Sequence, residues 1–161
     1  MDLVLPFRLK VAGRDEFRGA HAVSTSFRFR GFLRYSSRLL SIEWTGSAHV
    51  QDVGALSVRD DRLPLPTETL EVPVERLRTA TFRGGWWRPR LILCANDLQA
   101  LATVPSEEAG TVVFWIARSD RLVAGGLASA LTGAVRSPAP NPDPLGDLRT
   151  PRTPAGGPTT P

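Results

Sequence analysis

The residue types best suited to binding a partner are concentrated in residues 86–90, where two tryptophans are followed by Arg-Pro-Arg. An exposed indole beside guanidinium groups is typical of a membrane-interface anchor or of a hot spot in a protein–protein interface. Because side chains alternate across a strand, at most one of the two indoles can join the core directly. The structural alternative is that one indole caps the interior while a loop or an arginine stem covers the other. The candidate binding residues here are Trp86, Trp87, Arg88 and Arg90.

A second candidate site consists of four arginines that would share one side of the first predicted hairpin, namely Arg28, Arg30, Arg34 and Arg38. Guanidinium groups gathered on one face can hold an anionic lipid, a phosphate or an acidic partner. The alternative is a solvated outer face, paired with carboxylates such as Glu43. The phenylalanines that alternate with these arginines fall on the opposite face, whereas a groove for single-stranded nucleic acid needs rings and charges on one surface. We therefore expect no nucleic-acid partner.

The residues that could perform catalysis are few and scattered. His21 and His49 are the two histidines, and neither has a cysteine, histidine or carboxylate at metal-ligand spacing. Cys94 lies in an apolar run and is expected to be a buried, inert thiol. The adjacent carboxylates at residues 60–61 and 107–108 are typical of solvated loops, and no glycine motif that cradles phosphate is present. We therefore expect no catalytic residue, metal site or cofactor; a small-molecule enzyme assembled from distant residues stays as a second alternative.

Length and charge favour one domain with a modest basic excess. The chain has 161 residues, 20 basic against 16 acidic, with a net charge of +4, and Lys10 is the only lysine. This charge is small for a nucleic-acid-binding domain. A single cysteine allows no intrachain disulfide. The N-terminus lacks a signal-peptide pattern, and the longest uncharged stretch, residues 122–135, is shorter than a spanning helix of about 20 residues. A soluble, cytoplasmic protein is therefore expected.

The composition changes sharply near Ser137. Eight of the 14 prolines lie in residues 137–161, and this segment contains no aromatic residue. Proline removes main-chain donors, and so few large apolar groups cannot offset the entropy of ordering. We predict a domain over residues 1–136 and a disordered tail over 137–161, which serves as a spacer or, alternatively, carries a partner-binding motif.

Apolar residues recur at every second position over much of the body, which is typical of strands with one buried face. Residues 27–30 alternate Phe and Arg, and Gly31 is expected to permit a phase change, as in a bulge. Residues 35–38 are predicted to form a tight turn. The inward face of the next strand is predicted to be Leu40, Ile42 and Trp44.

The second half of the body continues this pattern after an irregular stretch. Residues 46–66 are predicted to be a long connection with one short strand near residues 56–58. Further strands are predicted at residues 70–74, 78–82, 86–94, 98–104 and 111–117. The pair Gly84-Gly85 suits the positive φ of a two-residue hairpin turn. Residues 105–110 are expected to be a polar loop, and the last strand is expected to be buried on both faces.

The period then changes to that of a helix. A stripe at helical spacing consists of Val123, Leu127, Ala130, Leu131 and Ala134. Ser119 is the expected N-cap, with Asp120 in the first turn. The fold class predicted is therefore mainly β: a bent antiparallel barrel or sandwich of about seven strands, closed by one C-terminal α-helix. Residues 1–20 are compatible with either a strand or an arm.

This order of elements resembles the pleckstrin-homology-like (PH-like) fold over residues 27–135. Segments similar to bacterial members are residues 29–34 (FRGFLR), 40–44 (LSIEW), 70–74 (LEVPV), 85–91 (GWWRPRL) and 117–121 (ARSDR). The predicted helix lacks the tryptophan that many eukaryotic members carry, and the nearest is Trp115. The first loop is short and followed by Arg38 alone, so headgroup binding by a basic first loop is not implied. The resemblance implies a non-enzymatic platform for proteins, peptides or membrane lipids.

These observations predict a non-enzymatic binding or scaffolding module whose partner is another protein. The predicted contact surface is residues 86–90 or an exposed sheet edge. The alternative is reversible association with an anionic membrane surface through the arginine-rich face of the first hairpin.

Overall fold

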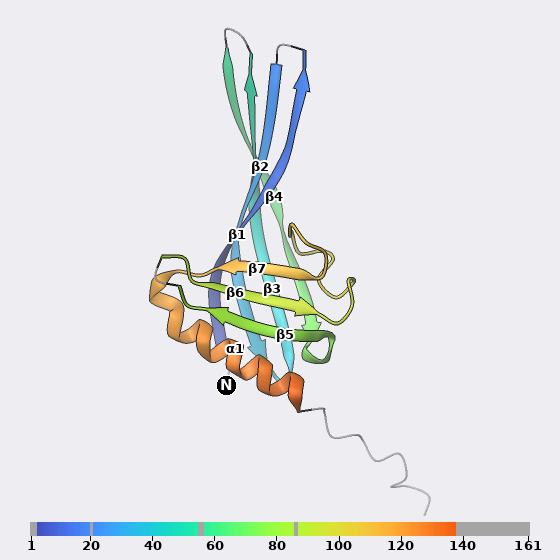
Figure 1. Ribbon diagram of the computed structural model, residues 1–161, viewed down its shortest axis with the longest axis vertical. Helices are drawn as coiled ribbons and strands as arrows, with labels where there is room; N and C mark the ends of the chain where they lie inside the picture. Colours follow the sequence, from blue (N-terminus) through green and yellow to red (C-terminus); the bar gives the residue numbers. More distant parts are fainter. Residues whose placement is uncertain (1–2, 20, 55–56, 86, 138–161) are drawn as a thin grey trace, which may run out of the picture.

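The computed structural model describes residues 3–19, 21–54, 57–85 and 87–137, with residues 14, 18 and 21 described by their main chain alone. The structure is mainly β, with seven antiparallel strands in one sheet and one C-terminal helix, as predicted (Figure 1). The elements are β1 (Leu3–Arg18), β2 (His21–Ser36), β3 (Leu39–Val53), β4 (Val58–Pro73), the 3-10 turn η1 (Val74–Arg76), β5 (Leu77–Arg83), β6 (Arg90–Ala95), β7 (Thr111–Trp115), the 3-10 turn η2 (Arg118–Asp120) and α1 (Arg121–Arg136).

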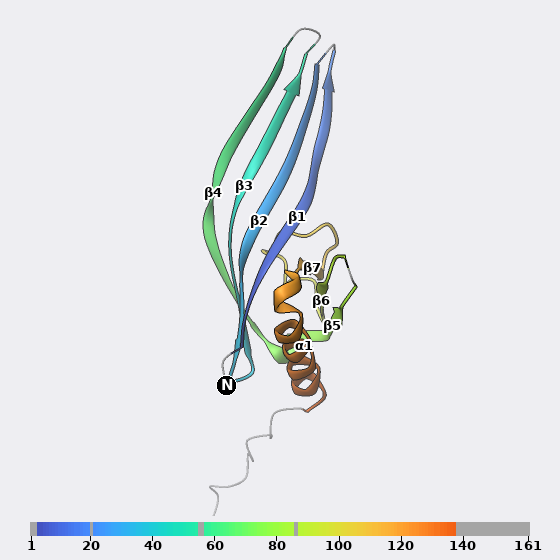
Figure 2. The same cartoon turned by 90° about the vertical axis from the view of Figure 1, so that its left-hand side faces the viewer.

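The first four strands are unusually long, with 15 or 16 residues each. At about 3.3 Å per residue they span about 50 Å. Their outer halves project beyond the rest of the molecule as a four-stranded arm, formed by the described parts of residues 12–26 and 47–64 (Figures 1 and 2). The prediction of a long connection over residues 46–66 is therefore wrong. Most of β4 is exposed on both faces, so no apolar alternation marks it as a strand.

The inner halves of β1–β4 form one layer over the hydrophobic core, and β5–β7 with α1 form the other (Figure 2). The rings of Phe7 on β1 and Phe114 on β7 meet edge to face across these layers, with centroids 4.7 Å apart. The predicted inward residues Leu40, Ile42 and Trp44 are all buried. Period-two burial therefore operates in this body, as the sequence indicated.

Gly31 does not introduce a phase change. Its neighbours stay in one continuous register with β1 and β3, in which Gly31 lies between Phe7 and Trp44. Leu33 is buried and Phe32 is 52% exposed, so Phe32 points outward with the arginines. The glycine is required for a different reason: a Cβ there would come within 1.9 Å of the Glu43 carbonyl oxygen. The main chain of the neighbouring strand β3 is too close at this point for any side chain.

Two predictions for the second half of the body are wrong. Strands β5 and β6 are joined by residues 84–89 rather than by a two-residue turn. Residues 98–104 form turns, with the Val104 N–H donating to the Leu101 carbonyl oxygen at 3.1 Å. The Asp97 carboxylate accepts the Ala100 N–H at 2.8 Å and so starts this turn. Burial at a three-residue spacing belongs to a helical turn, which a short window does not distinguish from a strand.

Helix α1 lies where the sequence predicted it, but its N-cap is Asp120 rather than Ser119. Its buried residues are Ala124, Leu127, Ala128 and Leu131. Val123 is 38% exposed, so the buried stripe is rotated relative to the predicted one. The helix packs against β5 and β1.

The sheet is bent but not closed. Its strand order is β4-β3-β2-β1-β7-β6-β5, so β4 and β5 are its edges. Apart from Ser137, the predicted tail lies outside the described residues. Among the described residues, no helix combines the length and apolar character needed to cross a bilayer.

Candidate functional site

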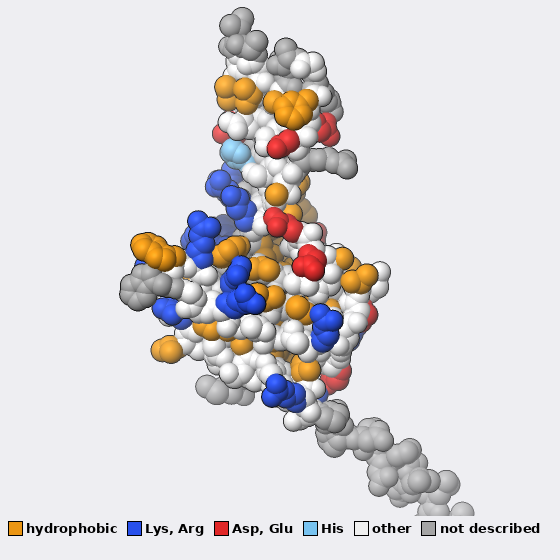
Figure 3. Space-filling model, in the orientation of Figure 1, with side chains coloured by type: hydrophobic (Ala, Val, Ile, Leu, Met, Phe, Trp, Pro, Cys, Tyr) orange, Lys and Arg blue, Asp and Glu red, His pale blue; other side chains and the backbone are white. Residues whose placement is uncertain are grey.

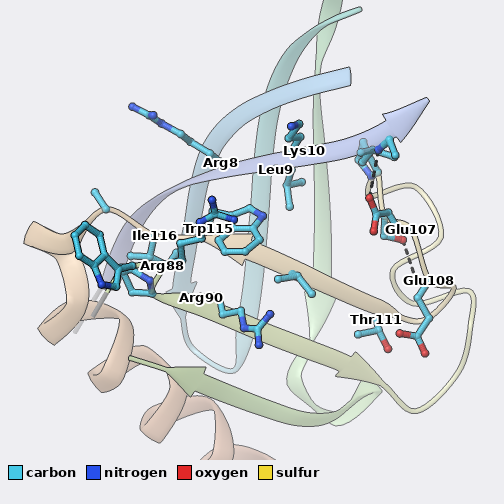
Figure 4. Close-up of a pocket in the computed structure, with 18 of the residues that line it drawn as sticks. Arg8, Leu9, Lys10, Arg88, Arg90, Glu107, Glu108, Thr111, Trp115 and Ile116 are labelled. Atoms are coloured by element: carbon cyan, nitrogen blue, oxygen red, sulfur yellow. Dashed lines mark hydrogen bonds between the residues drawn. The ribbon is translucent and has the colours of Figure 1, made fainter. Parts of the chain in front are cut away.

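A groove opens where the sheet bends between β1 and β7. These strands are joined by one residue pair, Arg8 with Trp115, and diverge beyond it. The hollow between them has a volume of about 880 Å³, and its walls come from β1, β6, β7 and the loops that flank them (Figure 4). It is therefore bounded by the arm on one side and by the small strands on the other.

A row of four arginines and one tryptophan crosses five strands at this bend. Directly paired residues in neighbouring strands project to the same face. Following the pairs from β2 to β5, the row consists of Arg30, Arg8, Trp115, Arg90 and Arg83. Like charges directly opposite one another destabilise a sheet. An anion bound over this row would relieve that repulsion.

Three arginines elsewhere in the described residues have acidic partners. Ion pairs join Arg38 to Glu75 at 2.7 Å, Arg59 to Asp61 at 2.8 Å and Arg76 to Asp97 at 3.0 Å. By contrast, within the described ranges no carboxylate lies within ion-pair distance of the following groove and row residues: Arg8, Lys10, Arg30, Arg83, Arg88, Arg90 and Arg118. The bend of the sheet therefore gathers several cations without a carboxylate partner in the described residues, although others, such as Arg28 and Arg78, lie elsewhere (Figure 3).

The groove is polar along its length. The guanidinium groups of Arg8, Arg88 and Arg90 lie toward one end, and the carboxylates of Glu107 and Glu108 lie at the other (Figure 4). Glu107 also contacts β1, because its Oε1 accepts the Ala12 N–H at 3.3 Å. An extended ligand in this groove would therefore meet positive charge at one end and negative charge at the other.

Trp87 lies beside this groove in a loop rather than on a strand. Its side chain is 77% exposed, and the Arg118 guanidinium lies over the ring at 5.1 Å from the centroid. Such cation–π pairs contribute about 0.5–1 kcal/mol at exposed sites. The indole thus forms a wall of the basic end. Trp86, the other predicted indole, lies outside the described residues.

The structure divides the four arginines of the first hairpin into two groups. Arg28, Arg30 and Arg34 occupy alternate exposed positions on the outer face of β2, as expected. Arg38 does not join them: it lies in the turn, at φ 65°, and its side chain faces α1. It donates to the carbonyl oxygens of Ala134 at 3.1 Å and Ser137 at 2.9 Å. Its role is to cap the C-terminal end of the helix.

The site residues predicted from the sequence did not include Arg8, Lys10, Trp115 and Arg118. Arg8 and Lys10 alternate with the buried Leu5, Phe7 and Leu9. That period-two signal in the first ten residues predicts an outward-facing basic pair. Trp115 and Arg118 carry no comparable local signal, because their place in the groove depends on the pairing of β7 with β1.

Two pKa shifts mark structural contacts away from the groove. Hydrogen bonds from the main chain and from Arg38 lower the pKa of Glu75 below its usual 4.5. A hydrogen bond from Arg76 lowers the pKa of Asp97 below its usual 3.8, against an opposing effect of desolvation. Both favour the ionised carboxylates that hold neighbouring segments together.

Of the residues weighed for catalysis from the sequence, Glu107 and Glu108 line the groove, whereas His49 and Cys94 do not. His49 Nε2 lies 2.9 Å from Asp60 Oδ1 across the arm. Cys94 is half-buried rather than buried, and its sulfur accepts the Thr111 hydroxyl at 3.8 Å. In the part of the chain that the structure describes, no three His, Cys, Asp or Glu side chains gather at metal-binding distances.

Comparison of the chain with models of known protein families, with curated proteins and with solved structures finds no match. The resemblance to the PH-like fold therefore stays a prediction. What is established is the class of structure: a bent, open antiparallel sheet with a projecting arm and a C-terminal helix. The groove at the bend is the feature from which a function can be argued.

Proposed function

We propose that this chain is a non-enzymatic binding module that holds an extended acidic segment of a partner protein in the groove between β1 and β7. The observation that supports this most directly is the set of groove cations without acidic partners, including Arg8, Lys10 and Arg90. Guanidinium groups bind carboxylates through two parallel hydrogen bonds, and Trp115 supplies an aromatic surface between them.

The shape of the site favours a peptide over a membrane. A volume of about 880 Å³ lies within the roughly 300–1,000 Å³ range of ligand sites. A flat bilayer would reach the exposed arginines of β2, such as Arg28 and Arg34, but not the walls of a groove recessed between two strands. The carboxylates of Glu107 and Glu108 at one end would also repel an anionic surface.

Calorimetric titration with a short glutamate-rich peptide tests this proposal. We expect binding that weakens with added salt, because solvent-exposed charges are screened beyond about 10 Å at 0.1 M. The double variant Arg8→Glu, Arg90→Glu should weaken binding by about tenfold or more, since charge-assisted hydrogen bonds contribute roughly 1.5–3 kcal/mol each. Arg78→Glu is a matched control, because Arg78 is exposed on β5 and does not line the groove.

A parallel titration with phosphatidylserine vesicles separates the two partner classes. Absence of peptide binding at low salt would overturn the proposal. The proposal would also be overturned if the protein bound vesicles but not the peptide. In that case, vesicle binding would be lost in the double variant Arg28→Glu, Arg34→Glu and retained in the groove variant Arg8→Glu, Arg90→Glu. That second result would assign the function to the outer face of β2.

A further inference from the structure

The sheet leaves two strand edges facing each other inside the groove. β1 and β7 are joined at Arg8 and Trp115 only, among the described residues. Main-chain groups two residues apart in a strand point to the same side. Lys10 on β1 and Val113 on β7 therefore direct their N–H and C=O groups into the gap, as the next residues beyond that pair. Neither has a strand partner there within the described ranges.

Two main-chain N–H groups further along these edges already have hydrogen-bond acceptors in the free protein. The Ala12 N–H on β1 is bound by a side chain, the Glu107 carboxylate, at 3.3 Å. The Thr111 N–H on β7 is bound by the Glu108 carbonyl oxygen at 3.2 Å. Both substitutes come from the loop between β6 and β7. They satisfy main-chain donors at the wide end of the gap. Lys10 and Val113, which lie nearer the Arg8–Trp115 pair, have no strand partner across the gap in the described part of the chain.

The two outer edges of the sheet are protected, in contrast to this gap. On β4, three prolines, Pro64, Pro66 and Pro73, remove main-chain donors. β5 is covered by α1, where the Thr132 hydroxyl donates to the Ala80 carbonyl oxygen at 3.0 Å. Proteins commonly protect exposed edges because an unpaired edge accepts another strand. Among the described residues, the groove edges next to the Arg8–Trp115 pair lack such protection.

We infer that the partner segment binds as an added β-strand in this gap, pairing with the main chain of β1 near Lys10 and of β7 near Val113. This inference rests on the proposed function, because it names how the acidic segment is held. In this arrangement, main-chain bonds hold the segment, and its alternate side chains face the arginines. Strand addition of this kind takes affinity from the main chain and specificity from the flanking side chains.

The orientation of charges restricts the sequence of the segment. Carboxylates on one face of the added strand meet Arg8 and Arg90 at the narrow end. At the wide end, Glu107 and Glu108 favour a neutral or basic residue. The segment expected is therefore extended, free of proline, acidic at one end and not at the other.

The test compares the glutamate-rich peptide with two derivatives that carry N-methyl groups on alternate amides. One derivative is methylated at the odd-numbered amides and the other at the even-numbered amides. The side-chain charges are unchanged, whereas donors along one edge are removed. We expect a loss of affinity of about tenfold or more for at least one derivative, as two or more main-chain bonds are lost. In parallel, hydrogen exchange followed by NMR should show the Lys10 and Val113 amides slowed by the unmodified peptide.

The variant Val113→Pro removes the donor from the chain itself, with Val113→Thr as the control that keeps it. Val113→Pro should weaken peptide binding and Val113→Thr should not; exchange at Lys10 decides the question if the proline variant does not fold. Equal binding of all three peptides without amide protection would overturn strand addition while the proposed function stands. No binding of any peptide would overturn both.

Discussion

At the scale of single residues, arginine has two distinct roles in this chain. Arg38 and Arg76 hold segments together, each through a carboxylate on another element. Arg8 and Arg90 lie at the bend of the sheet without such partners in the described structure. The residue type is the same, so the difference lies in which acidic groups the fold brings near.

The role of Arg38 in holding segments together predicts a specific loss of stability. Arg38→Ala removes hydrogen bonds to Glu75 and to the carbonyl oxygens of Ala134 and Ser137. Because the side chain is partly exposed, we expect a loss of about 1–2 kcal/mol in the free energy of unfolding. Urea denaturation measures this. Arg34→Ala, an exposed change on the same hairpin, should stay within about 0.5 kcal/mol; equal losses in both variants would contradict the capping role.

A pH dependence follows from Asp97. Its pKa in the folded protein is lowered, mainly by the hydrogen bond from Arg76. The stabilisation from this pair is therefore complete above the usual pKa of 3.8 and is lost as the pH falls through the lower, folded-state value. In Arg76→Gln, NMR titration should show the Asp97 pKa rising toward 3.8. An unchanged pKa would show that the Ala100 N–H, rather than Arg76, holds the carboxylate.

At the scale of elements, glycine shows how tightly strands and helix pack. A Cβ on Gly31 would meet the Glu43 carbonyl oxygen at 1.9 Å and the Phe7 ring at 2.9 Å. A Cβ on Gly126 in α1 would meet nothing within 4 Å. Close packing on the sheet therefore does not require a glycine at position 126.

Alanine substitutions at these two glycines should have opposite effects. Gly126→Ala should stabilise the protein by about 0.5–1 kcal/mol, because alanine loses less conformational entropy in a helix. Gly31→Ala should destabilise it by about 1–3 kcal/mol or more, because neither strand can move without breaking its pairing. Thermal melting of the two variants measures both effects. A stabilising Gly31→Ala would show that the strands are less constrained than their register indicates.

At the scale of the whole molecule, the arm and the body differ in what holds them together. The body has a hydrophobic core between two layers, whereas the arm is a single layer. At the end of the arm, Phe17 is 82% exposed and Val58 is 65% exposed, in one row across the strands with Ala22 and Val53 (Figure 3). The arm depends on main-chain pairing and on continuity with the body.

This difference predicts uneven hydrogen exchange. The amides of residues 22–25 and 50–53 in the arm should exchange faster than those of residues 40–44, which lie over the core. Regions with few buried apolar contacts open at a lower free-energy cost than the core. Exchange followed by mass spectrometry or NMR measures this. Equal protection along β3 would mean that the arm does not open independently.

Local patterns in the sequence determined the class of the fold and most of the body. Alternation predicted the buried residues of β3, and helical spacing predicted α1, because burial on one face imposes a period of two or 3.6 on neighbouring residues. The outward position of Arg28, Arg30 and Arg34 follows from the same rule. These features need no knowledge of the rest of the chain.

Only the tertiary structure determined the arm and the groove. The outer half of β4 is a strand because β3 supplies main-chain partners, not because of an apolar pattern. Arg8, Arg90 and Trp115 are far apart in the sequence and meet because β1 pairs with β7. Strand pairing is made by main-chain groups that every residue shares, so side-chain patterns carry little information about which strands become neighbours.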